Sequence, residues 1–205
     1  MRPTAAGPTA GPWTFDPVRL GAHECDAWVG YYRHDWWLVL RSALGMVRVG
    51  FGMGPVATLL GAWWVLRANQ VWAPYPDNDP DRAREFMRRF YALVARAHGL
   101  TIDPVEAARR EVAWWREHRV LQRERTDADE AALVTALADL YAYVYGRPVP
   151  SMLAPARDRA LAMRVSDAWV ADGCRAEDPR VREERRLLVR SYARLLDVVG
   201  PHSAG

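Results

Sequence analysis

The strongest constraint on the fold is a helix-start signal that recurs along the chain, an aspartate followed directly by a proline. It occurs four times, at Asp16-Pro17, Asp79-Pro80, Asp103-Pro104 and Asp178-Pro179. The aspartate side chain can accept hydrogen bonds from free backbone N–H groups of a first helical turn, and proline has a φ angle that suits the next position. Each pair therefore predicts the start of a helix.

Further local signals mark other helix starts and several helix ends. Glu106 follows Asp103, and Glu130 follows Asp127, at the three-residue spacing of a capping box. Four glycines each follow an apolar stretch of helical period, at the place where a left-handed residue commonly ends a helix. These glycines are Gly99, Gly146, Gly173 and Gly200.

Between these signals the apolar residues recur with the period of a helix, and no segment alternates with the period of a strand. The sequence predicts eight helices, over residues 18–32, 36–50, 55–72, 80–98, 104–124, 128–145, 155–172 and 179–199. Short connections favour antiparallel neighbours in one compact, bundle-like all-α domain. We expect this domain to cover residues 15–200, between a flexible Pro/Gly/Ala-rich tail at 1–14 and a flexible C-terminus at 201–205.

Charge and cysteine content narrow the class of protein. All 28 basic residues are arginines and face 25 acids, so the formal charge at pH 7 is only +3. Nucleic-acid binding needs basic residues gathered into a patch, which this balance does not indicate, so we expect no nucleic-acid partner. Cys25 and Cys174 form no CxxC unit, and residues 1–13 lack the apolar run of a signal peptide. We therefore expect a soluble, cytoplasmic protein.

The longest uncharged segment, residues 49–66, has 18 residues, which is near the lower limit for a membrane-spanning helix. Glycines and a proline interrupt its first half, so we expect the continuous helix to begin at Pro55 and to be a buried core helix rather than a membrane span. The alternative is contact with a membrane surface, with Trp63, Trp64 and Trp72 as interfacial anchors.

Three basic side chains form a polar line beside an apolar helix. His34, Arg41 and Arg48 are seven residues apart and would lie close to one helix face. The simplest interpretation is that this line is the solvent-exposed side. The alternative is that it faces a ligand carboxylate or phosphate, or an acidic partner helix, because so apolar a helix is expected to be buried on most sides.

An acidic cluster precedes the fourth predicted helix. Asp77, Asp79 and Asp81 alternate along the chain and could bind a hard cation. Helix capping already accounts for them, because Asp79 occupies the N-cap position and Asp81 lies in the first turn, where negative charge is favourable. We therefore predict no metal site and keep these three residues as the only metal candidates.

The helix predicted at 104–124 carries the residues with the clearest chemical potential. Glu111, Trp115, His118 and Gln122 recur at spacings of three and four along one face. Glu111 and His118 are about 10.5 Å apart along the helix axis, at ~1.5 Å per residue, so the two cannot share one metal ion without other helices. A metal-free acid–base role, with His118 as the titrating group, is the catalytic hypothesis.

The aromatic content is high, with ten Trp, eight Tyr and four Phe. Core packing is the default role of such rings, but they can also line an apolar ligand pocket or form a partner-binding surface. The residues considered for this role are Tyr141, Tyr143, Tyr145, Trp169 and Tyr192, together with Trp115. Among them we select Trp115, Tyr141 and Tyr145 as candidate ligand-binding residues.

The sequence as a whole favours a helical binding protein. Trp and Arg, which are frequent at binding hot spots, are abundant, while every catalytic motif considered is incomplete and no cofactor is indicated. We expect a protein that encloses an apolar or aromatic small molecule or docks on a protein partner. The alternatives are a small all-α enzyme that uses Glu111 and His118, with a cation at the acidic cluster, and a protein associated with a membrane surface.

Overall fold

The computed structural model describes residues 12–124, 127–175 and 177–201. This part of the chain forms eight α-helices and no β-strand, which confirms the predicted all-α fold. The helices are α1 (Pro17–Tyr32), α2 (Trp36–Phe51), α3 (Pro55–Trp72), α4 (Pro80–His98), α5 (Pro104–Glu124), α6 (Asp127–Tyr145), α7 (Val149–Ala171) and α8 (Pro179–Val199).

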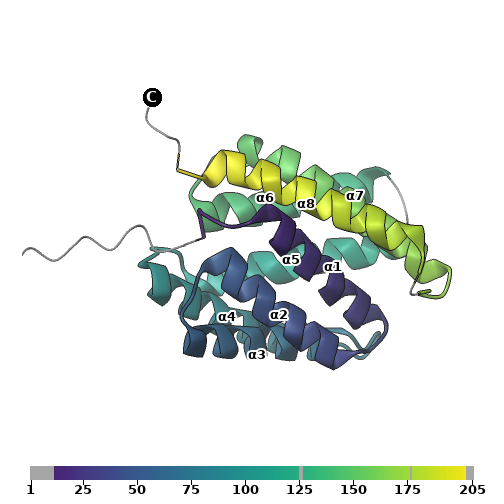
Figure 1. Cartoon of the computed structure of the whole chain (residues 1–205), viewed down its shortest axis with the longest axis horizontal. Helices are drawn as coiled ribbons and strands as arrows, with labels where there is room; N and C mark the ends of the chain where they lie inside the picture. Colours follow the sequence, from purple (N-terminus) through teal and green to yellow (C-terminus); the bar gives the residue numbers. More distant parts are fainter. Residues whose placement is uncertain (1–11, 125–126, 176, 202–205) are drawn as a thin grey trace, which may run out of the picture.

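The eight helices form a closed ring. Each helix packs against the one before it and the one after it in the chain, and α8 packs against α1. In Figure 1, α6, α7 and α8 form one layer and α2, α3 and α4 the other, while α1 passes in front and α5 behind. An even number of helices allows every neighbour to be antiparallel, as short connections require. The inner faces of all eight helices consequently surround one interior.

The closure between α1 and α8 depends on a glycine. A Cβ atom added at Gly21 of α1 would lie 2.7 Å from the backbone nitrogen of Val189 in α8. That distance is too short for a non-bonded contact between a carbon and a nitrogen atom. The nitrogen belongs to the backbone of Val189, so it cannot move away as a flexible side chain could. Gly21 therefore allows the two helix backbones to approach closely enough to close the ring.

The predicted aspartate caps are confirmed. Asp16, Asp79, Asp103 and Asp178 each accept a backbone N–H bond of 2.9 Å from the first turn of their helix. The predicted capping box at Asp103 is wrong in one detail, because the Asp103 N–H donates to the Tyr143 hydroxyl at 2.9 Å instead of to Glu106. Glu106 pairs with Arg109 and Arg110. The predicted cap by Asp127 lies outside the described side chains.

Three of the four predicted glycine ends are confirmed. Gly99, Gly146 and Gly173 have φ angles of 63°, 61° and 89°, in the left-handed region. Gly200 is different: its φ of −61° and ψ of 156° are extended. The reason is that Pro201 follows it, because a proline disfavours helical and promotes extended geometry in the preceding residue.

The seventh helix is longer than predicted. It begins at Val149, six residues before the predicted start at 155, and contains Pro155 in its interior. Pro150 lies in the first turn, where the missing N–H leaves no hydrogen bond unmade. The Pro155 carbonyl accepts a 2.8 Å bond from the Ser191 hydroxyl of α8, which ties this part of α7 to α8. The helix therefore continues through Pro155, although a proline removes one backbone hydrogen bond from a helix interior.

The segment that was predicted to be a buried core helix is buried on one face only. The α3 helix begins at Pro55, as predicted, and Gly61, Ala62 and Ala68 lie on its buried face. The opposite face exposes apolar side chains, namely Val56, Leu59, Leu60 and Trp63. No helix in the described ranges combines the length and the apolar character that crossing a bilayer requires.

The packed chain begins earlier than the predicted boundary at residue 15. The Trp13 ring makes an edge contact with His98 of α4, with ring centroids 6.5 Å apart. Phe15 is buried against Tyr192 of α8 in a similar contact at 6.0 Å. The rest of the expected tail, residues 1–11, and the C-terminal residues 202–205 lie outside the described part of the chain.

The cap of α4 allows a direct test of capping against metal binding. We expect Asp79→Ala to lower the free energy of unfolding by about 0.5–2 kcal/mol, because the Arg82 N–H loses its acceptor. Asp79→Asn should restore most of this loss, since an amide oxygen accepts the same bond. For each variant, urea unfolding should give the same free energy of unfolding in EDTA as in Mg²⁺. Stabilisation by Mg²⁺ that Asp77→Asn or Asp81→Asn removes would contradict the capping interpretation.

Candidate functional site

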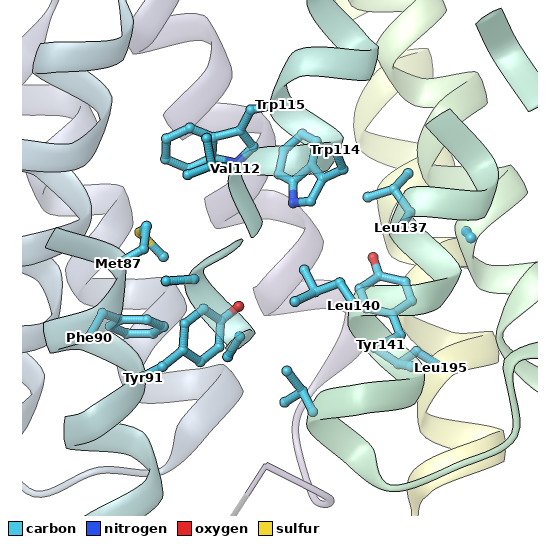
Figure 2. Packing of buried hydrophobic residues seen from close by; sticks show 14 of the residues in the cluster. Met87, Phe90, Tyr91, Val112, Trp114, Trp115, Leu137, Leu140, Tyr141 and Leu195 are labelled. Atoms are coloured by element: carbon cyan, nitrogen blue, oxygen red, sulfur yellow. The ribbon is translucent and has the colours of Figure 1, made fainter. Parts of the chain in front are cut away.

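The helical ring encloses a cavity of about 520 Å³ that is lined by side chains from all eight helices. Figure 2 shows part of its wall, where Phe90 and Tyr91 of α4 face Leu140 and Tyr141 of α6. The indole rings of α5 lie along the edge between these two groups. The volume is within the range of small-molecule sites, about 300–1,000 Å³.

A buried ion pair lies in the wall of the cavity. Arg159 of α7 donates through Nη2 to a carboxylate oxygen of Glu24 in α1 and through Nη1 to the Tyr141 hydroxyl at 3.1 Å. The guanidinium also stacks over Trp114 of α5, 4.7 Å from the ring centroid. Glu24 is 1% exposed, so neither charge of this pair is solvated by bulk water. One guanidinium thus contacts three helices besides its own.

Glu111 of α5 is the second carboxylate that lines the cavity. It accepts hydrogen bonds from the Tyr91 hydroxyl at 2.6 Å and from the indole N–H groups of Trp114 and Trp115, each at 3.1 Å. Burial raises the pKa of Glu111 above its ordinary value, although these donors and Arg159 act in the opposite direction. The site therefore holds a desolvated carboxyl group whose lone pairs already have fixed donors.

His118 lines the same cavity and is held by a carboxylate. Its Nε2 lies 3.1 Å from Oδ1 of Asp167 in α7, and the Gln122 amide donates to the same oxygen at 2.6 Å. Gln122 also reaches the Tyr32 hydroxyl at 2.8 Å. Glu111 and His118 are thus bound to different partners and are not hydrogen-bonded to each other.

The cavity opens where its lining residues are exposed, at His34, Tyr75 and Arg123, which we call the mouth. Arg123 stacks on the Tyr75 ring with its Cζ 3.7 Å from the centroid. Arg119, one turn earlier in α5, lies between two rings, 4.9 Å from Trp72 and 5.2 Å from Tyr75. Aromatic rings therefore hold both guanidiniums at the entrance.

Most of the predicted site residues meet at this cavity. The candidates that line it are Glu111, His118, His34, Trp115, Tyr141 and Tyr145. Of the other aromatic residues considered, Tyr192 also lines it, whereas Trp169 is fully buried elsewhere and Tyr143 bonds to Asp103. These candidates come from α5, from α6 and, for His34, from the connection between α1 and α2.

The predicted line of His34, Arg41 and Arg48 is not formed. Asp35 caps α2, so His34 lies before the helix, in a left-handed conformation with φ of 57°. Arg41 and Arg48 are exposed on the outer side of α2 and do not line the cavity. The structure thus places them on the solvent side, and no ligand carboxylate in the cavity could reach them.

The acidic cluster is also outside the cavity. Asp79 caps α4, Asp81 pairs with Arg84 one turn later, and Asp77 is exposed. Across the ranges that the structure describes, no three His, Cys, Asp or Glu side chains are placed so that they could hold a metal ion together.

Arg159, Glu24 and Arg119 were not predicted as site residues. The sequence contains a signal for Glu24 and Arg159, because the neighbours three and four positions away on either side are apolar. Around Glu24 these neighbours are Leu20, Gly21, Ala27 and Trp28. A charge in this setting lies on the buried stripe of its helix. The same signal marks Arg41 and Arg48, which are exposed, because α2 is apolar on every face and the pattern has no polar side for comparison.

Comparisons with known proteins add no relative. No protein-family model matches the chain, and searches of curated proteins and of solved structures find no significant match. The chemistry of the cavity is therefore the basis for the functional argument.

A third buried carboxylate, Glu184 of α8, does not line the cavity but is fully buried between helices. Burial raises its pKa to about 8; Ser166 opposes this shift, while the charges of Glu24 and Asp167 add to it. Glu183, its neighbour, is partly exposed and has a pKa lowered by hydrogen bonds from Arg186. The two adjacent glutamates therefore change the free energy of unfolding with pH in opposite directions.

We expect the free energy of unfolding to fall as the pH rises from about 5 to 8. The native state keeps the Glu184 proton up to a pKa of about 8, whereas the unfolded chain releases it near 4.5. This difference contributes up to about 1.4 kcal/mol per pH unit. In Glu184→Gln this contribution is removed, so the variant should exceed the wild type in stability at pH 8 and approach it at pH 5.

Urea unfolding at pH 5, 6.5 and 8 measures this dependence, with Glu183→Gln as the matched control. The lowered pKa of Glu183 contributes stability that is lost only below pH 4.5, so this variant should keep the wild-type slope between pH 5 and 8. Equal slopes for Glu184→Gln and the wild type would show that Glu184 is ionised in the folded protein at pH 8.

Proposed function

We propose that this protein binds a small, largely apolar molecule within the ring of helices. The observation that carries the proposal is the cavity of about 520 Å³ with walls from all eight helices. Its lining is mostly aromatic and aliphatic, and a few polar groups converge on it from Glu111, Arg159 and Tyr141. This combination is typical of sites that recognise small molecules by shape and orient them by a few hydrogen bonds.

The same contacts favour binding over the acid–base alternative. Glu111 is held by three donors, and His118 is engaged by Asp167, so the two groups serve separate networks. A general acid or base must be free to reach the proton that it transfers, whereas both of these groups already have protein partners. Glu111 and His118 are about 10.5 Å apart along α5, at ~1.5 Å per residue. This separation suits contacts with two parts of one bound molecule.

The cavity proposal can be tested with N-phenyl-1-naphthylamine, a neutral fluorophore that brightens in apolar surroundings. We expect saturable binding to the wild type. Ala27→Phe should raise its dissociation constant at least about tenfold, because Ala27 of α1 lines the cavity and the added ring takes up ligand space. Fluorescence titration gives the constant, and circular dichroism checks that the variant is folded.

Ala22→Phe is the matched control, since Ala22 is a half-buried alanine of the same helix that does not line the cavity. It should leave the dissociation constant within about twofold. If both phenylalanine variants bind the fluorophore as the wild type does, the dye binds elsewhere and the cavity proposal is wrong.

A second candidate role comes from the outer face of α3. Val56, Leu59, Leu60 and Trp63 are exposed by 71%, 60%, 44% and 46% and form one stripe along the helix. Residues 36–76 contain no acidic residue, while Arg41, Arg48 and Arg67 make no ion pair with an acid in the described ranges. The Arg67 guanidinium lies 5.9 Å from the centroid of the Trp63 ring, and apolar side chains beside a basic residue suit the surface of an anionic membrane.

We therefore expect binding to vesicles of phosphatidylglycerol and not to vesicles of phosphatidylcholine. The double variant Leu59→Ser, Trp63→Ser should reduce the bound fraction at least about tenfold in a sedimentation assay, since each apolar side chain contributes about 1.5–3 kcal/mol when buried. The control is Leu161→Ser, Val105→Ser, which alters two exposed apolar residues on α7 and α5. If the wild type does not bind vesicles but self-associates, and the Leu59→Ser, Trp63→Ser variant does not self-associate, the exposed face of α3 is a dimer interface and the membrane role is wrong.

A further inference from the structure

The mouth of the cavity has an excess of positive charge. Three guanidiniums line the cavity, from Arg119, Arg123 and Arg159, against the carboxylates of Glu24 and Glu111. Arg159 and Glu24 neutralise each other as an ion pair in the wall. Burial also disfavours the charged form of Glu111, as its raised pKa indicates. The unbalanced charge therefore belongs to Arg119 and Arg123.

Neither of these two arginines forms an ion pair with an acid in the described part of the chain. Arg119 donates only from Nη2, to the Tyr31 hydroxyl and the Trp72 carbonyl, both at a long 3.3 Å. Arg123 donates to the Tyr75 hydroxyl at 2.9 Å. The remaining N–H groups of two stacked guanidiniums are thus available to an acceptor that enters the cavity.

The helix dipole explains only one of the two charges. Arg123 lies in the last turn of α5, where a cation is favourable. Arg119 lies one turn earlier and is half-buried between Trp72 and Tyr75. Two like charges four residues apart on a helix repel each other, and an anion between them would relieve this repulsion.

We infer that Arg119 and Arg123 bind the anionic head of an amphipathic organic molecule whose apolar body occupies the cavity. This inference rests on the proposed cavity function and names its ligand class, an organic carboxylate. A carboxylate suits the site because its two oxygens accept charge-assisted bonds from planar guanidiniums, which the rings of Trp72 and Tyr75 hold in place.

The test compares two ligands with the same body, naphthalene-2-carboxylate and naphthalene-2-carboxamide, in displacement of N-phenyl-1-naphthylamine at one ionic strength. The wild type should bind the carboxylate about tenfold more tightly than the neutral amide. Arg123→Gln, an exposed position, should reduce this ratio to about threefold. Arg119→Gln, Arg123→Gln together should bring it close to one.

Arg116→Gln is the control, because Arg116 is exposed on the same helix and does not line the cavity. It should keep the tenfold ratio. If wild-type protein binds the amide and the carboxylate equally, the anionic subsite is overturned while the cavity proposal stands. If the ratio persists in the double variant, a guanidinium other than these two recognises the carboxylate and the assignment is wrong. If neither ligand displaces the dye, the cavity proposal itself fails.

Discussion

The Arg159 guanidinium joins four of the eight helices of the ring. It belongs to α7, pairs with Glu24 of α1, bonds to Tyr141 of α6 and stacks on Trp114 of α5. Removal of one member of such a buried pair typically costs 3–5 kcal/mol, because the remaining charge is left without compensation. The positions of these four helices are thus linked through one side chain, which also contacts the rings of Tyr141 and Trp114 in the cavity wall.

A buried ion pair adds little net stability, since the cost of desolvating both charges nearly equals their attraction. Its benefit here is a defined geometry. Apolar side chains could pack around the cavity in several arrangements, as Leu140, Val144 and Leu195 do not require a particular geometry. The hydrogen bonds of Arg159, by contrast, fix the direction and the distance of its partners. Glu111 has the same effect on α4 and α5, because three donors from Tyr91, Trp114 and Trp115 converge on it. An interior of this size can remain open without collapse because such contacts hold its walls.

Local signals predicted the helices well because capping chemistry is local. Asp16, Asp79, Asp103 and Asp178 reveal their role through residues two or three positions away, so no tertiary information is needed. The errors arise where distant packing decides. Pro155 lies inside α7, where its carbonyl bonds to Ser191 of α8, and nothing near Pro155 in the sequence indicates this contact. The same holds for the cavity: the candidate residues on α5 and α6 were recognisable, but Arg159 and Glu24 become a pair only when α8 closes on α1 and brings the two ends of the chain together.

The two ends of the cavity differ in charge, because the charges in the wall are paired and, among the described residues, those at the mouth are not. In the wall, Arg159 and Glu24 neutralise each other's charge through one contact, while Glu24 Oε2 and Arg159 Nε make no hydrogen bond in the described part of the chain. At the mouth, Arg119 and Arg123 stack on aromatic rings, and neither pairs with a carboxylate in the part of the chain that the structure describes, so the rings position the guanidiniums without neutralising them. Desolvating a charge is costly, and the cost is lowest where the site remains partly open to water. For the proposed amphipathic ligand, the favoured orientation therefore has the charged end at the mouth and the apolar part among the rings, where the ion pair in the wall stays intact.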